Sequence, residues 1–272
     1  MKKKVKEINI DGNINKKICL ISDIHFYRNY NLKIFDIIEK NIKANKPDYI
    51  CIPGDIIDIP NLEISKLKPL YDFLTRLGSI CKVFISLGNH DLSVDHSYYY
   101  NEPYIKSLSS IKNVFLLANN EYIDKNIRFI GIMDNVNVSH KEHGLDNIII
   151  KDYNNLFKMI DIKDNKYNIL LAHNPIYLVK KETTKKIDDW SYISLVLSGH
   201  THGGLMPEFI KTHYGIVSPA KRLLPKNIRG KFCINGTNII ISNGVVKLSY
   251  CAGVLHKFNF LFPISIDYIN IK

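Results

Sequence analysis

The chain has no long apolar run. Of its 272 residues, 46% are hydrophobic, but no segment approaches the ~18 consecutive apolar residues that a membrane-spanning helix needs. The N-terminus is basic, and Glu7, Asn9 and Asp11 interrupt the segment that follows it, so no signal-peptide pattern is present. We therefore expect a cytoplasmic protein with a sizeable core. Because no repeat or linker divides the chain, we expect residues 1–272 to form a single domain.

Paired cysteines are also missing. The five cysteines are far apart in the sequence and form no CxxC motif: Cys19, Cys51, Cys81, Cys233 and Cys251. Three of them fall in or beside apolar runs. We interpret them as reduced thiols of the core rather than as a disulfide framework or a zinc site.

Acidic residues are in the minority. The chain has 26 Asp and Glu against 37 Lys and Arg, which gives a formal net charge of +11. Such an excess either attracts an anionic partner, such as a phosphate ester, an acidic lipid or nucleic acid, or forms a solvated lysine-rich surface. The sequence has no arginine-rich arm and no dedicated nucleic-acid module, which argues against nucleic acid. Nothing in the sequence indicates the oligomeric state.

What the chain does contain is an alternation of short apolar runs and amphipathic segments. Helices are expected over residues 31–44, 62–77 and 145–160, with Gly78 ending the second. Strands are expected over residues 17–22, 49–53, 83–87, 114–117, 127–132, 168–172, 193–197, 238–242 and 264–271. The strand–helix–strand beginning implies parallel strands, and the late strands predict a second, mixed or antiparallel sheet.

A polar cluster follows each of five expected strands. The clusters are DIH at 23–25, GDIID at 54–58, GNHD at 88–91, HNP at 173–175 and GHTH at 199–202. In open α/β sheets, ligands gather at the carboxyl ends of strands. Any one cluster has an alternative interpretation as a helix cap or a turn. Five clusters of metal-ligating residue types indicate a site for two divalent transition metals.

In this order, the motifs DxH, GDxxD, GNHD, the lone histidine before Asn-Pro, and GHTH resemble those of the calcineurin-like metallophosphoesterase superfamily. The resemblance implies an α/β fold, a four-layer α-β-β-α sandwich of two facing mixed sheets. The GHTHGG and AHNP forms look most like a bacterial branch of membrane-related phosphodiesterases. Members of that branch often carry an N-terminal membrane or export segment, which is not recognisable here.

The same resemblance implies the metal ligands. Asp23, His25, Asp55 and His202 would hold one ion. Asp55, Asn89, His173 and His200 would hold the other, with Asp55 bridging the pair. The two ions would be divalent or trivalent Mn, Fe or Zn, a choice that the ligand types do not settle.

The resemblance further implies hydrolysis of an anionic phosphoester, with a diester expected before a monoester, by a hydroxide that bridges the metals. His90 would assist the leaving group, and Asp91 would either orient His90 or cap a turn. Asp58 would support the site from behind or begin a helix. Alternative functions are a phosphomonoesterase or a nuclease using the same site, or a non-catalytic binding or scaffold protein.

A basic loop follows the GHTH motif. Between residues 206 and 231 it contains six basic residues, Lys211, Lys221, Arg222, Lys226, Arg229 and Lys231, against the single acid Glu208. Leu223 and Leu224 lie among them. One interpretation is a solvated loop. The other is a wall in which Arg222 and Arg229 bind substrate or an anionic headgroup, which predicts peripheral contact with anionic membrane lipid.

Overall fold

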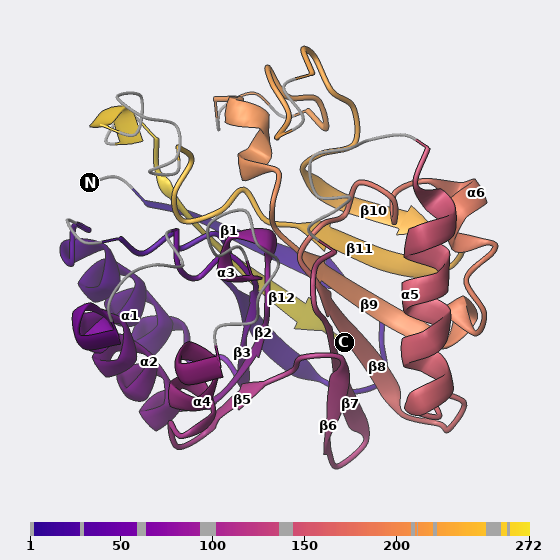
Figure 1. Ribbon diagram of the computed structural model, residues 1–272, viewed down its shortest axis with the longest axis horizontal. Coiled ribbons are helices and arrows are strands. Elements are labelled where there is room, and N and C mark those ends of the chain that lie inside the picture. Colours follow the sequence, from indigo (N-terminus) through magenta and orange to yellow (C-terminus); the bar gives the residue numbers. More distant parts are fainter. Residues whose placement is uncertain are drawn as a thin grey trace.

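Two six-stranded β-sheets form the centre of the computed structural model (Figure 1). It describes residues 3–27, 30–58, 64–92, 102–135, 144–207, 210, 212–219, 222–248, 257–259 and 262–272. The first sheet has the order β1 (Lys3–Ile10), β12 (Ile264–Ile271), β2 (Lys16–Leu20), β3 (Tyr49–Pro53), β4 (Lys82–Ser86) and β5 (Val114–Leu116). Strands β2 to β5 are parallel, and β12 pairs antiparallel with β2.

The second sheet has the order β10 (Gly230–Ile234), β11 (Thr237–Ile241), β9 (Ile193–Ser198), β8 (Tyr167–Ala172), β7 (Ile127–Ile132) and β6 (Asn120–Asp124). Its four central strands are parallel, whereas β6 and β10 pair antiparallel at the two edges. In each sheet, the carboxyl ends of several parallel strands therefore lie at the same end of the sheet. Ligands collect at such ends in open α/β folds.

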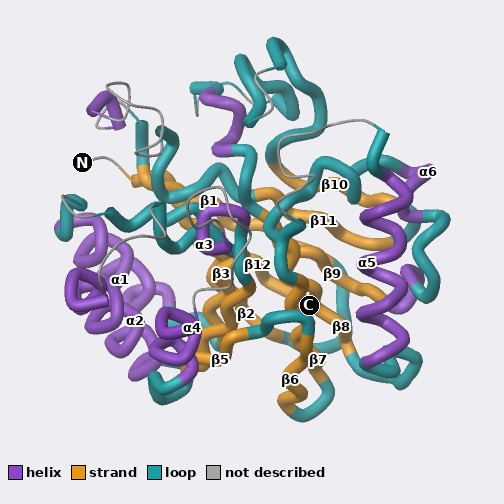
Figure 2. Tube along the Cα trace, in the orientation of Figure 1, coloured by secondary structure: helices purple, strands orange, loops and turns teal. Residues whose placement is uncertain are grey.

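Helices cover the outer faces of both sheets (Figure 2). The helices α1 (Lys33–Asn45), α2 (Lys68–Ile80) and α4 (Glu102–Ser109) lie on the first sheet, and α5 (Asp146–Met159) and α6 (Lys181–Thr184) lie on the second. In α1, the residues Ile34, Phe35, Ile38 and Ile42 recur at helical spacing and are all buried. Four shorter helices are α3 (Asn89–Leu92), η1 (Ile64–Leu67), η2 (Trp190–Tyr192) and η3 (His202–Leu205).

The core between the sheets is apolar and aromatic. Phe84 of β4 and Phe129 of β7 stack with ring centroids 3.8 Å apart, and Leu20, Leu171 and Leu197 belong to the same buried cluster. Separate clusters lie beneath the helices of each sheet. The predicted four-layer α-β-β-α arrangement of two facing mixed sheets is confirmed.

Some element predictions were wrong. Gly78 does not end α2, which continues to Ile80. A Cβ at Gly78 would lie 2.5 Å from the carbonyl oxygen of Lys112, so the glycine permits close packing. The late strands do not form one sheet of their own, because β11 joins the second sheet and β12 returns to the first. The strands β1, β6 and β10 were missed; all three are sheet-edge strands with partly exposed side chains.

The cysteine prediction is confirmed for Cys19 and Cys51, which are buried free thiols. Cys81 and Cys233 are also free, although Cys233 is exposed, and Cys251 lies outside the described residues. Within the described ranges, none of the helices has the length and apolar character required to cross a bilayer.

Candidate metal centre

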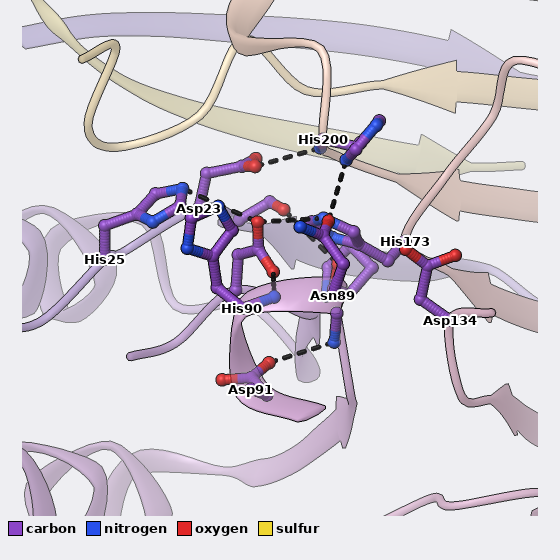
Figure 3. A network of polar contacts seen from close by, with 12 residues as sticks. Asp23, His25, Asn89, His90, Asp91, Asp134, His173 and His200 are labelled. Carbon is purple, nitrogen blue, oxygen red and sulfur yellow. Dashed lines mark hydrogen bonds and ion pairs between the residues drawn. The ribbon is translucent and has the colours of Figure 1, made fainter. Parts of the chain in front are cut away.

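Five strand ends bring seven predicted ligands to one place. Figure 3 labels five of them: Asp23, His25, Asn89, His173 and His200. Strands β2, β3 and β4 of the first sheet and β8 and β9 of the second sheet converge there. The loops that follow these strands carry the side chains: Asp23 and His25 after β2, Asp55 after β3, Asn89 after β4, His173 after β8, and His200 and His202 after β9. Residues separated by up to 179 sequence positions thus share one buried site.

One group of ligand atoms comprises Asp23, His25 and His202. Their nearest nitrogen and oxygen atoms all lie within 4.8 Å of one another. His202 Nε2 is 3.8 Å from Asp23 Oδ1, and the rings of His25 and His202 stack with centroids 4.9 Å apart. These three side chains can surround one cation.

A second group comprises Asp55, His173 and His200, again within 4.8 Å. His173 Nε2 is 3.0 Å from Asp55 Oδ2, and His200 Nδ1 is 3.0 Å from Asn89 Oδ1. At this separation, His200 Nδ1 can donate a hydrogen bond to Asn89 Oδ1, or both residues can ligate the same cation.

Asp55 lies between the two groups. Its Oδ2 atom is 3.0 Å from His173 Nε2 of one group and 3.6 Å from His25 Nε2 of the other. A carboxylate has enough lone pairs to serve two ions. The geometry therefore suits a bridging role for Asp55.

Three of the histidines are oriented for metal binding, because one ring nitrogen of each already contacts an oxygen of the protein. His25 Nδ1 pairs with Asp58 Oδ1 at 3.1 Å, and His173 Nδ1 and His202 Nδ1 each lie 2.7 Å from a backbone carbonyl oxygen. Metal-ligating histidines typically donate the second ring N–H in this way. Among the described residues, the buried atoms Asp23 Oδ2 and His25 Nε2 make no hydrogen bond. Cations would satisfy these atoms, which are otherwise costly to bury.

The acidic and basic side chains of the centre shift one another's pKa values. Burial alone would raise the pKa of Asp55, but the neighbouring His173, His90 and His25 lower it well below its usual range. Burial lowers the pKa of His173, and the Asp55 carboxylate outweighs this and raises the pKa to about 10. The Asp55 carboxylate thus favours the protonated form of His173. Metal binding must displace that proton, because only a neutral imidazole ligates.

Five of the ligands adopt a backbone conformation that L-residues rarely use. The φ angles are 55° for Asp23, 48° for His25, 51° for Asp55, 69° for His200 and 49° for His202. Each such residue costs of the order of 1–3 kcal/mol and persists where the surroundings enforce it. The concentration of this strain in the ligand loops marks the site as a functional one.

Two glycines permit the ligand loops to approach each other. A Cβ at Gly88 would lie 2.2 Å from Asp55 Oδ1, and a Cβ at Gly199 would lie 1.9 Å from Ser22 Oγ and 2.5 Å from Asp23 Oδ2. Any side chain at either position would push a ligand carboxylate away.

His90 lies beside the centre and is held by Asp58. Its ring meets His25 edge-on with centroids 4.7 Å apart, and its Nδ1 is 3.1 Å from Asp58 Oδ1. Asp58 Oδ1 also lies 3.1 Å from His25 Nδ1. Burial would raise the pKa of Asp58, but hydrogen bonds with the two histidines lower it far below its usual range. One carboxylate thus orients a ligand and the neighbouring histidine together.

The prediction that Asp91 orients His90 was wrong, and the alternative of a turn cap fits the contacts. The Asp91 carboxylate accepts hydrogen bonds from the backbone N–H groups of Ile56, Ile57 and Gly88 at 2.9–3.1 Å. It therefore ties the loop after β3 to the loop after β4. Burial, with the nearby charge of Asp55, raises the pKa of Asp91 to about 6. Asp91 positions the loops and does not face the reacting groups.

The two arginines of the basic loop differ in exposure. Arg222 is exposed, whereas Arg229 is buried, and its Nη1 donates to the carbonyl oxygen of Met206 at 3.1 Å. This contact corrects the assignment of Arg229 to substrate binding, because its guanidinium supports the loop from inside. Lys211, Lys221 and Glu208 lie outside the described residues.

A cavity of about 400 Å³ lies at the carboxyl end of β7, and none of the seven predicted ligands is among its lining residues. Asp134 forms part of its wall, lies near His173 in Figure 3, and contributes to the raised pKa of that histidine. The remaining lining combines apolar and polar side chains: Leu92, Asn119, Ile132, Met133, Asn135, Asp152, Asn155, Leu156 and Met159. In the sequence, Asp134 and Asn135 follow the strand expected over residues 127–132, and that position is the only sequence signal for this wall.

Comparisons with known proteins agree with this geometry. A family model described as calcineurin-like phosphoesterase matches residues 16–204, which is more than half of the chain. The chain is 28% identical over 221 residues to an uncharacterised metallophosphoesterase of Campylobacter jejuni, covering 78% of this chain and 52% of that protein. It is 29% identical over 231 residues to an uncharacterised metallophosphoesterase of Aquifex aeolicus, covering 84% and 77%.

The chain thus spans about half the length of the Campylobacter relative. Among solved structures, a dimetal phosphatase from Danio rerio matches with a TM-score of 0.48 and 13% identity, over 86% of this chain and 88% of that one.

Proposed function

This chain belongs to the calcineurin-like phosphoesterase family, and we propose that it hydrolyses phosphodiesters at a centre of two metal ions. Membership of the family supports a metal-dependent phosphoester hydrolase. The observation that carries the proposal is the position of the Asp55 carboxylate between the two ligand groups.

Seven side chains would hold the ions. Asp23, His25 and His202 would bind one, Asn89, His173 and His200 would bind the other, and Asp55 would serve both. When bound, the two ions would supply Lewis acidity, which offsets the charge of the phosphate and lowers the pKa of water. Mn, Fe or Zn would suit the site, because histidine nitrogen and carboxylate oxygen bind all three.

Two residues of the protein, His90 and Asp58, act on the leaving group. His90 lies within 4.8 Å of ligand atoms of His25 and Asp55, at the edge of the centre. Asp58 engages Nδ1 of His90, so we assign Nε2 as the atom that donates a proton to the departing oxygen. Asp58 also favours the protonated imidazole, because its own pKa is held low.

The cavity at the end of β7 supports the preference for diesters. A diester keeps an organic group on each side of phosphorus, and one of them can extend past Asp134 toward this cavity of about 400 Å³. Asp134 and Asp152 make this wall acidic, so the group that it accepts is neutral or cationic rather than a second phosphate.

A hydrolysis panel tests the proposal. Protein supplied with Mn²⁺ is offered bis-p-nitrophenyl phosphate, p-nitrophenyl phosphate, a cyclic nucleotide and a nucleotide-linked diester. We expect diester hydrolysis that Asp55→Asn abolishes. Exposed Asp72, in helix α2, provides the control Asp72→Asn, which should keep full activity.

Faster hydrolysis of the monoester than of the diester would replace the diester preference with a phosphomonoesterase. No hydrolysis of any ester, with metal bound, would remove the enzymatic proposal.

A further inference from the structure

An apolar hairpin projects beside the metal centre. It comprises the described residues 214–219 and 222–226, and we call it the 214–226 hairpin. An antiparallel bridge joins Val217 to Leu223, and backbone hydrogen bonds run from Leu224 N to Ile216 O at 3.0 Å and from Gly215 N to Pro225 O at 3.0 Å. The hairpin is therefore a defined element within the basic loop.

The hairpin exposes large apolar side chains. Leu223 is 74% exposed, Leu224 70%, Tyr214 47% and Ile216 45%. Elsewhere in the described residues, exposed apolar side chains such as Met159 on α5, at 72%, and Ile123 on β6, at 44%, lie on other elements. One exposed apolar residue is ordinary, whereas four on one short hairpin form a patch that water contacts unfavourably.

Basic residues surround the apolar patch. Arg222 and Lys226 are exposed, and Lys226 Nζ lies 5.8 Å from the ring centroid of Tyr214. The sequence contains no Asp or Glu between residues 209 and 231. Apolar side chains with a basic rim and no acid are the pattern of segments that lie in the interface of an anionic membrane.

The hairpin is fixed to the turn that carries the metal ligands. Ile216 N donates to the carbonyl oxygen of Gly204 at 2.7 Å, and Val217 N lies 3.3 Å from the same oxygen. Gly204 belongs to η3, which begins at the ligand His202. In Figure 1 the orange segment that follows β9 accordingly projects beyond the strand ends that hold the centre.

We propose that the 214–226 hairpin docks this protein on an anionic lipid bilayer. Leu223 and Leu224 enter the interface, and Arg222 and Lys226 contact the lipid phosphates. A bilayer fits because the patch offers apolar insertion and positive charge together. Docking there would place the metal centre next to phosphoesters at the membrane surface. The interaction is independent of catalysis, so it can fail while hydrolysis remains intact.

Vesicle sedimentation tests the docking. The full chain is mixed with vesicles of phosphatidylglycerol and phosphatidylcholine in equal parts, or of phosphatidylcholine alone. We expect binding to the mixed vesicles only. Leu223→Ser with Leu224→Ser should weaken it about tenfold or more, and Arg222→Glu with Lys226→Glu should abolish it. Ile123→Ser, at an exposed apolar position of β6, is the control and should bind as the wild type. The leucine pair and the control should hydrolyse a soluble ester at the wild-type rate.

Tryptophan fluorescence gives a second, direct readout. Trp190 is the only tryptophan of the chain and is buried, so it adds a constant background. The tryptophan of Leu223→Trp should emit at shorter wavelength when the mixed vesicles are added, and that of Ile123→Trp should not. Failure of the wild type to sediment, equal binding of the serine pair, or an unshifted Leu223→Trp spectrum would each overturn the proposal.

Discussion

At the scale of single residues, the shared carboxylate of Asp58 is the least obvious part of the site. It contacts His25 and His90 through one oxygen, at 3.1 Å from each Nδ1. A ligand and the residue assigned to the leaving group are therefore oriented by the same atom. Their positions cannot be changed independently.

The role assigned to His90 predicts a dependence on the leaving group. His90→Ala should lower kcat about 10²–10⁴-fold for an alkyl ester, whose departing oxygen needs a proton. The loss should be much smaller for a p-nitrophenyl ester, because p-nitrophenolate leaves unprotonated. Rates measured with both esters on both proteins check this. An equal loss for the two esters would mean that His90 acts elsewhere in the reaction.

Asp58→Asn should impair two properties together. Without the carboxylate, His25 loses its orienting partner, and metal affinity should fall about 10–100-fold. His90 loses the same partner, so kcat at saturating metal should fall as well. Metal titration and initial rates measure the two effects. Asp72→Asn, at an exposed helix position, is the control. If metal affinity were unchanged in Asp58→Asn, the contact with His25 would have no role in binding.

The residue types were predictable from sequence, but the contacts between them were not. The ligands appear as polar clusters after apolar runs, and the strand ends bring those clusters together. Asp91 follows His90 in the sequence, but neighbouring residues need not have side chains in contact, so its role as the partner of His90 was wrongly predicted. In the short helix α3, Asp91 turns instead toward backbone N–H groups of two loops.

At the scale of elements, the loops rather than the strands determine whether a metal site forms. Two glycines let the loops pass close to ligand carboxylates, and the ligands themselves take left-handed backbone angles. Rigid parallel strands on both sides hold the loops in this strained arrangement.

Gly199→Ala should therefore damage the site without unfolding the sheet. The added methyl would meet Ser22 Oγ and displace Asp23, and we expect kcat to fall about 100-fold, since a displacement near 1 Å can have that effect. Gly236→Ala is the control: its φ of 86° also strains an added methyl, but that methyl would enter open space at the β10–β11 turn, so kcat should be retained. Rates and circular dichroism measure both variants. A Gly199→Ala enzyme with full activity would show that the loops have room to adjust.

Element prediction succeeded where periodicity is strong and failed at the sheet edges. The fully buried strands β3, β7 and β8 are mostly apolar runs and were predicted within one residue at each end. The edge strands β1, β6 and β10 mix exposed and partly buried residues, and Lys, Asn and Glu obscure their pattern. Sheet pairing had no local signal, because β12 pairs with strands more than 240 residues away.

At the scale of the whole molecule, a buried arginine helps to join the edge of the second sheet to the loop before β8. Arg128 of β7 donates from Nη1 and Nη2 to the two oxygens of Asp164 at 2.7 and 2.9 Å. Lys166 and Arg128 lower the pKa of Asp164 to about 2. A depressed carboxylate pKa stabilises the folded state above the unfolded-state pKa near 4, and this stabilisation is lost as the pH falls toward 2.

The difference in Tm between wild type and Asp164→Asn should therefore be largest at neutral pH and should shrink by about pH 3. Thermal unfolding at the two pH values measures it. Asp161→Asn, in the same loop, is the control and should show no such trend, as Asp161 has no salt bridge within the described residues. A Tm difference that stays the same from neutral to acidic pH would show that the ion pair of Asp164 is not its cause.

The most direct test of the account is the number of metal ions that the chain binds. Titration with Mn²⁺, followed by metal analysis after gel filtration, should give two ions per wild-type chain. His25→Ala with His202→Ala should leave one, and His173→Ala with His200→Ala should also leave one. Fewer than two ions in the wild type, or two ions retained in either double variant, would contradict a pair of sites joined by Asp55.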